Sequence, residues 1–206
     1  MKRIHHWHTF LFLNTVILIH INLSAIARFL CFVLPCLFLV SACVPDTNGD
    51  RLFEVPYPIV DFSIPAGRPT FQSHVVSQNS VPTGLVEAMR IAGVSPDEVD
   101  VYSGLRARVV SLTGDNFDEV ERIELRACPI GTPGGCAPQD LLFSQSDLFR
   151  RRQQTIDLNP GLVNFRELFL GSDNVRVELV FFFGITTSRT IEARLEWAGA
   201  AFGNVE

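Results

Sequence analysis

Cysteine is the residue type with the clearest chemistry in this chain, and Cys43 has the most informative surroundings. It follows the uncharged, mostly apolar stretch Phe29–Ala42, which begins directly after Arg28 and ends in the small residues Ser41 and Ala42. This stretch is shorter than the roughly 20 apolar residues of a transmembrane helix. It has the length and flanking residues of the apolar region of a secretory signal peptide. The sequence therefore predicts an export leader that ends just before a reactive thiol.

The residues Val40-Ser41-Ala42-Cys43 resemble the lipobox of bacterial lipoproteins. This resemblance implies that the thiol of Cys43 is diacylated, that the preceding peptide is cleaved, and that the new N-terminus is acylated as well. Because one acyl chain holds a protein only marginally, stable attachment needs two or more. In such lipoproteins the residue after the lipidated cysteine decides the sorting, and an aspartate there keeps the protein in the inner membrane. This chain has Val44 at that position. The resemblance therefore implies the outer membrane of a bacterial cell envelope, with the protein facing the periplasm or the cell surface. An uncleaved membrane anchor and a chance match in a soluble protein remain as alternatives.

The other cysteines divide between the leader and one short segment. Cys31 and Cys36 lie in the leader, whereas Cys128 and Cys136 flank a segment rich in glycine and proline. An exported chain meets an oxidising compartment, where such a pair forms a disulfide. We therefore predict a Cys128–Cys136 disulfide that closes a surface loop between two strands. A metal site would need more ligands than these two thiols and a distant histidine.

Groups suited to catalysis near neutral pH are scarce outside the leader. Lys2 is the only lysine, and His74 is the only histidine after residue 42. Most acid–base and nucleophilic mechanisms use one of these residue types, and we find no nucleophile motif. We therefore expect a non-catalytic module that binds a protein partner or helps an assembly, without a cofactor. The alternative is a tethered carboxylate-based hydrolase, because the chain has 22 acidic residues and a formal net charge of −5. This acidic balance argues against a nucleic-acid partner.

An oxygen-rich turn is a weak candidate for calcium binding. It contains Asp115, Asn116, Asp118 and Glu119, and oxygen ligands suit Ca²⁺. The spacing does not fit the helix–loop–helix calcium pattern, and acidic residues are common in turns.

Two groups of aromatic residues are candidate contact surfaces. Phe181, Phe182 and Phe183 give a segment that is apolar on both faces. It is either an exposed patch for a partner or is covered by a second sheet or by a helix near Phe165. Sugar binding would need exposed aromatic platforms, for which the chain offers Trp197, Tyr57 and Tyr102.

The arrangement of elements predicts a leader (1–42), a lipidated cysteine with a short tether (43–50) and a β-sandwich domain (51–206). Two helices are expected, Thr83–Ala92 ending at Gly93, and Pro160–Leu170 with Asn159 as N-cap. Strand patterns dominate the rest, at Arg51–Ile64, Thr70–Val76, Val99–Leu112, Glu119–Cys128, Gln139–Gln145, Gln153–Leu158, Asn174–Phe183 and Thr187–Ala198. Many short strands with two helical connections predict a mainly β fold, an antiparallel sandwich. The element order loosely resembles the immunoglobulin-like sandwiches of outer-membrane lipoproteins and late-embryogenesis-type domains.

The last two strands show the clearest alternation. Ile191, Ala193, Leu195 and Trp197 fall on one face, and the charged residues between them on the other. We predict that Asn174–Phe183 and Thr187–Ala198 form an antiparallel hairpin, with the apolar set in the core.

Overall fold

The computed structural model describes residues 49–204, which belong to one compact unit, Thr47–Glu206. The predicted leader and Cys43 lie outside the described residues. The unit is mainly antiparallel β, as the sequence predicted, and its strands are β1 (Asp50–Pro56), β2 (Val60–Ile64), β3 (His74–Pro82), β4 (Val101–Ser111), β5 (Val120–Pro129), β6 (Leu141–Gln145), β7 (Thr155–Pro160), β8 (Asn174–Phe183) and β9 (Ile191–Gly203). The helices are α2 (Leu85–Ala92) and α3 (Arg166–Leu170), with a 3₁₀ turn at Pro96–Glu98.

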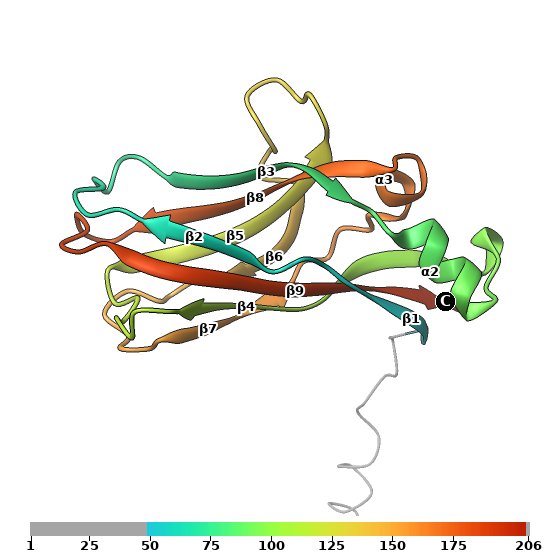
Figure 1. Ribbon diagram of the computed structural model, residues 1–206, viewed down its shortest axis with the longest axis horizontal. Helices are drawn as coiled ribbons and strands as arrows, with labels where there is room; N and C mark the ends of the chain where they lie inside the picture. The colour runs from blue at the N-terminus through green and yellow to red at the C-terminus, as the bar shows by residue number, and fades with distance from the viewer. Residues whose placement is uncertain (1–48, 205–206) are drawn as a thin grey trace, which may run out of the picture. The chain divides into compact units, whose positions relative to one another are not determined.

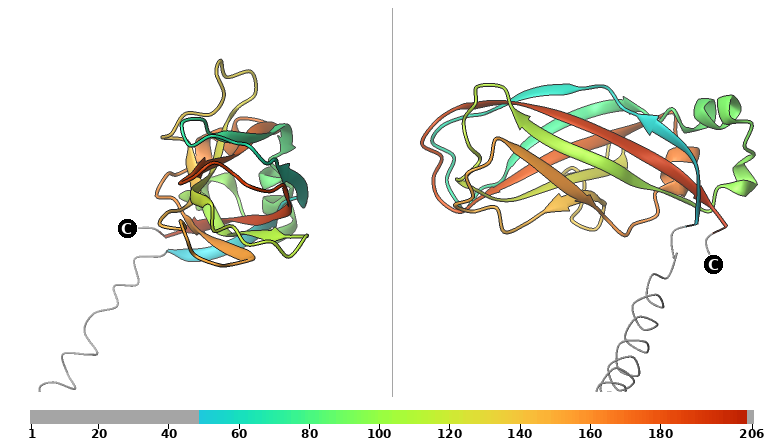
Figure 2. Two further views of the ribbon diagram at one scale, coloured as in Figure 1. Left: turned by 90° about the vertical axis from the view of Figure 1, so that its left-hand side faces the viewer. Right: turned by 90° about the horizontal axis from the view of Figure 1, so that it is seen from below.

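The strands form one sheet that curls into two facing layers. Its order is β1-β9-β4-β7-β6-β5-β8-β3, and β2 also pairs with β9. The pairing between β6 and β7 covers only Phe143↔Pro160 and Ser144↔Asn159, and it joins the two layers. One layer contains β1, β2, β9, β4 and β7, and the other contains β6, β5, β8 and β3 (Figures 1 and 2). The layers therefore share one edge at β6–β7, while β2 and β3 lie at the opposite side.

The core lies between the two layers and follows the alternation of the strands. In β9, Leu195 and Trp197 are buried, and in β5 and β8 the residues Leu125 and Leu179 are buried as well. Successive side chains of a strand point to opposite faces, so each strand supplies every second residue to this interior. Within residues 49–204 the buried apolar residues form one cluster inside this compact unit, and we infer that the unit folds on its own.

The predicted hairpin of the last two strands is wrong, although the predicted faces are confirmed. β8 pairs with β3 and β5, whereas β9 pairs with β1, β2 and β4. The connection after Phe183 therefore crosses from one layer to the other. Alternation specifies which face is buried but carries no information about the neighbouring strand.

The first helix is confirmed, and the second is shorter than expected. α2 ends at Gly93, whose φ of 70° is the left-handed conformation that stops a helix. The expected helix over Pro160–Leu170 forms only at Arg166–Leu170. Pro160 instead closes β7, and Gly161 N donates to Leu142 O at 2.8 Å. A Cβ on Gly161 would lie 2.3 Å from a β6 carbonyl oxygen, so this close approach of the backbone to β6 replaces the first turns of the helix.

Candidate functional site

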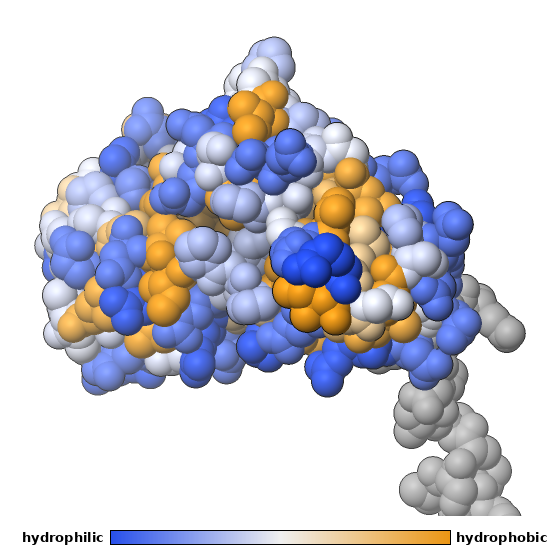
Figure 3. Space-filling model, turned by 45° about the vertical axis from the view of Figure 1, so that its right-hand side comes forward, coloured by the Kyte–Doolittle hydropathy of each residue, from blue (hydrophilic) through white to orange (hydrophobic). Residues whose placement is uncertain are grey.

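Cys128 and Cys136 form a disulfide, as the sequence predicted. The sulfur atoms are 2.08 Å apart, and the bond pins the loop that connects β5 to β6. Figure 1 shows this loop standing out beyond β3. Both cysteines are buried, but Ile130 within the loop is 53% exposed. The disulfide therefore holds a projecting loop whose apolar residue faces solvent. Figure 3 shows apolar patches separated by polar side chains, one of them just below the tip of this loop.

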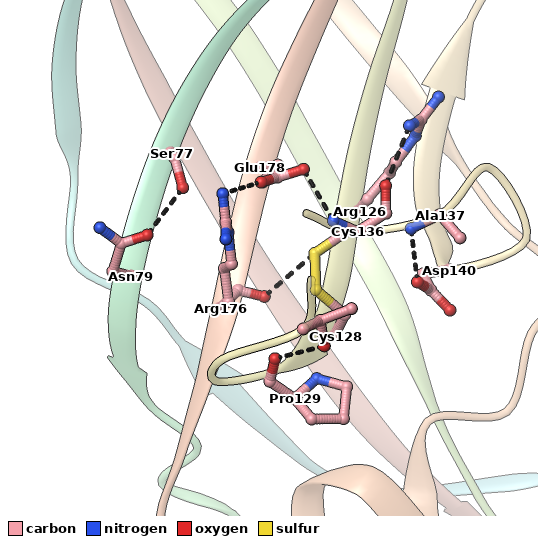
Figure 4. Close-up of a disulfide and its surroundings, with 11 residues drawn as sticks. Ser77, Asn79, Arg126, Cys128, Pro129, Cys136, Ala137, Asp140, Arg176 and Glu178 are labelled. Atoms are coloured by element: carbon pink, nitrogen blue, oxygen red, sulfur yellow. Dashed lines mark hydrogen bonds and ion pairs between the residues drawn. A yellow bond between two sulfur atoms is a disulfide. The ribbon is translucent and has the colours of Figure 1, made fainter. Parts of the chain in front are cut away.

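The base of the loop rests on a buried carboxylate of β8. The backbone N–H of Cys136 donates to Glu178 Oε2 at 3.0 Å, and Arg176 Nη2 lies 2.5 Å from Glu178 Oε1 (Figure 4). Glu178 is only 4% exposed. Gly135 has φ +90°, and a Cβ there would lie 2.6 Å from the carboxylate. Only glycine therefore lets the loop descend onto this carboxylate.

A second buried carboxylate lies on β5 beside the loop. Glu124 is 6% exposed, and it accepts a hydrogen bond of 2.9 Å from Arg126 Nε. Arg122 Nη1 is 3.0 Å from its other oxygen. Arg126 also donates to the carbonyl oxygen of Cys136 at 3.2 Å. The charged residues of the outer face are thus linked through arginine to the disulfide loop.

This arrangement is structural rather than catalytic. Each buried carboxylate is held by at least one arginine, so neither is a free base or nucleophile. We did not predict this arrangement of Arg122, Glu124 and Arg126 around the loop. Their positions at every second residue place them together on the outer face of β5, and this was the available signal.

A hollow lies on the outer face of the layer that contains β9. It does not support the alternative function of a carboxylate-based hydrolase. This hollow has a volume of about 490 Å³ and contains Asp157 and Glu196. Arg108 lies opposite both of them in the sheet register, and its Nε donates to Glu196 at 2.8 Å. An arginine therefore occupies the place where two catalytic carboxylates would need to flank a substrate bond.

The calcium candidate is not confirmed, because its carboxylates already have protein partners. Asp118 Oδ1 accepts a hydrogen bond of 2.6 Å from Arg189, and Asp115 lies 3.7 Å from the same guanidinium. Glu119 is buried and accepts a bond of 3.0 Å from the backbone of Ser188. The carbonyl oxygen of Asn116 also accepts from Arg189. Within residues 49–204 no cluster of three or more potential ligands could hold a metal ion. In this turn, Arg189 contacts Asp115, Asn116 and Asp118 and so takes the place that a cation would need.

Phe181, Phe182 and Phe183 do not form an exposed patch. Phe181 and Phe183 are 0% and 2% exposed, and the ring of Phe62 from the opposite layer lies 5.5 Å from that of Phe181. Phe182 is half-buried, with the guanidinium of Arg122 4.0 Å from its ring centroid. The hypothesis of a partner patch here is wrong, because the second layer covers the inner face and an arginine covers the outer one.

Tyr57, Tyr102 and Trp197 meet in the core, so they are not a platform for sugar. Tyr57 stacks on Trp197 at 3.7 Å, and its hydroxyl lies 2.6 Å from that of Tyr102. Burial raises the pKa of both tyrosines, so both stay protonated. The Tyr57 hydroxyl donates to the carbonyl oxygen of Thr83 at 2.9 Å, which joins the end of β1 to the end of β3.

His74 is a hydrogen-bonded strand residue. Its Nε2 lies 3.0 Å from the carbonyl oxygen of Ser63, between β3 and β2. Partial burial lowers the pKa of His74 below its usual value, although the hydrogen bond to Ser63 acts in the opposite direction. The histidine therefore stays neutral at neutral pH and donates to that carbonyl.

Within residues 49–204, no helix combines the length and the apolar character needed to cross a membrane. Cys43 lies outside the described residues, so its lipidation stays a prediction.

Comparison with known proteins identifies no family for this chain. No family and no curated protein matches its sequence. Among solved structures, a chain of Cocksfoot mottle virus covers 75% of this chain and 85% of its own length, with 11% identity and a TM-score of 0.28. A chain of Desmodium yellow mottle tymovirus covers 73% and 91%, with 11% identity and a TM-score of 0.26. Similarity at this level carries no functional argument.

Proposed function

We propose that this protein is a non-catalytic lipoprotein of the bacterial cell envelope, anchored through acyl chains on Cys43, which binds a protein partner through the loop between Cys128 and Cys136. The observation that carries the proposal is the disulfide-pinned loop. A stable disulfide is typical of exported proteins, so it supports the export that the lipobox resemblance implies.

The loop has the properties of a pre-organised contact. The disulfide and the hydrogen bond from Cys136 to Glu178 fix both of its ends. Ile130 within the loop is exposed, and no charged residue lies between the two cysteines. A rigid loop loses less conformational entropy on binding than a flexible one. An exposed isoleucine on such a loop is therefore a suitable anchor for an apolar pocket of a partner.

Site-specific photo-crosslinking in the native envelope tests the proposal. A photoreactive residue replaces Ile130 in one variant and Leu162 in the control, since Leu162 is also exposed and apolar but lies elsewhere. We expect a discrete protein adduct from position 130 and none from position 162. The adduct should disappear when Cys128 and Cys136 are both replaced by serine. Equal labelling from both positions, or no adduct from position 130, would contradict the proposal.

A further inference from the structure

A cleft opens between β2 and β3, on the side where the two layers do not share a pairing. Its volume is about 350 Å³. β2 pairs with β9, and β3 pairs with β8. The two strands face each other as the free edges of opposite layers, so the cleft leads from solvent towards the core.

Two cross-links close the ends of this cleft. At one end Ser63 O and His74 Nε2 are 3.0 Å apart, and at the other the Tyr57 hydroxyl donates to Thr83 O at 2.9 Å. The cleft walls lie between these two contacts, from Pro58–Asp61 and Val76–Pro82. With a rise of about 3.3 Å per strand residue, the two contacts lie roughly 20 Å apart along the chain from Tyr57 to Ser63 and roughly 30 Å apart along the chain from His74 to Thr83. The cleft is therefore bounded at each end by a hydrogen bond that joins its two sides.

The floor of the cleft is apolar. It is formed by inward-facing residues of both layers, namely Leu125, Val177, Leu179, Leu195 and Trp197. Ile59 lies at the mouth and is 56% exposed. Binding sites for small molecules are concave, mostly apolar, and about 300–1,000 Å³ in volume. The cleft lies at the small end of this size range, and its accessible lining is polar and apolar in about equal measure above the buried apolar floor.

The rim offers neutral hydrogen-bonding groups. Gln78 and Ser80 are exposed on β3, and within residues 49–204 their side chains make no hydrogen bond that would occupy them. Asp61 is the one ionisable residue of the described lining, and Arg194 holds its carboxylate through bonds of 2.7 and 3.0 Å. A charged ligand would thus find no unpaired partner there.

We infer that the cleft between β2 and β3 binds a small, uncharged molecule with an apolar body and a polar group, the body lying over Leu179, Leu195 and Trp197 and the polar group contacting Gln78 or Ser80. This inference does not depend on the anchor or on the loop contact. It assigns a second binding site to the domain, separate from the disulfide loop on the outer face.

Trp197 makes the test direct, because it lies in the cleft and is the only tryptophan in residues 47–206. The probe is the neutral apolar dye N-phenyl-naphthylamine, titrated into residues 47–206 without detergent. We expect saturable binding with energy transfer from Trp197 to the dye. A straight-chain alcohol such as decanol should displace the dye.

The matched variants are Val76→Phe and Val75→Phe. Val76 lines the cleft, whereas Val75 is its neighbour on the opposite face of β3 and is 44% exposed. Val76→Phe should weaken dye binding at least tenfold, and Val75→Phe should change it less than twofold. If Val76→Phe does not fold, Ile59→Asp at the exposed mouth should reduce dye affinity to a similar degree. Absence of dye binding by the unmodified domain, or an equal response of the cleft variant and the Val75 control, would overturn the inference.

Discussion

Removing the disulfide should destabilise the domain by an amount set by the short loop that it closes. The perturbation is the double replacement Cys128→Ser with Cys136→Ser, across a sequence separation of 8 residues. In the chain-entropy description, a loop of this length stabilises the folded state by about 2.5 kcal/mol at room temperature. For urea unfolding with a slope of about 1–3 kcal/mol per M, the midpoint should fall by on the order of 1 M.

The assay is urea unfolding of residues 47–206 with and without a reducing agent, with Trp197 fluorescence as the signal. The reducing agent should lower the midpoint of the unmodified domain to that of the double variant and leave the variant unchanged. If the unmodified domain does not respond to reduction, or the two differ by less than about 0.5 kcal/mol without reductant, then the disulfide does not constrain the loop as described.

Three further predictions concern single residues. Leu195→Asp should lower the free energy of unfolding by several kcal/mol, because it places a charged side chain in the core. Arg194→Ser removes only a surface ion pair and should lower it by less than about 1 kcal/mol. Thermal melts compare the two variants, and equal losses of stability would refute the assigned face. Gly135→Ala should lower stability more than Gly134→Ala, because both have positive φ but only the former would contact a buried carboxylate; melts in the opposite order would contradict the loop geometry. Because burial lowers the pKa of His74, its contribution to stability is present above about pH 6.5 and is lost as the pH falls through the folded-state pKa. The free energy of unfolding, measured at several pH values, should therefore fall more steeply with acid in the unmodified domain than in His74→Gln. Parallel curves for the two proteins would refute this.

The sequence predicted burial well because side-chain alternation is a local property. The apolar residues Ile191, Ala193, Leu195 and Trp197 face the core as expected. Alternation does not indicate which strand lies next to a given strand in the sheet. For this reason the predicted pairing of β8 with β9 was wrong. The segment after Phe183 connects the two layers instead of closing a hairpin.

The candidate site was only partly predictable from the sequence. The disulfide followed from residue type and export, but the buried Glu178 beneath it depends on the register between β5 and β8, which places Arg126 opposite it. The acidic turn was misjudged for a similar reason. Asp118 forms an ion pair with Arg189, which is distant in the sequence. The residues near Asp118 therefore could not indicate this partner.

The cleft could not be predicted either, since it depends on how far the edge strands of two layers separate. Its walls include Val60 and Val76, which the sequence predicted to lie in the strands Arg51–Ile64 and Thr70–Val76, without indicating that these strands face each other. The bonds that close its ends involve Ser63 with His74 and Tyr57 with Thr83. Each joins residues whose proximity follows from the curling of the sheet.

The most direct test of the proposed function is the intact mass of the protein extracted from its native membrane. The account predicts a chain that begins at Cys43 and carries two or three acyl chains. An unmodified chain that retains residues 1–42 would contradict it.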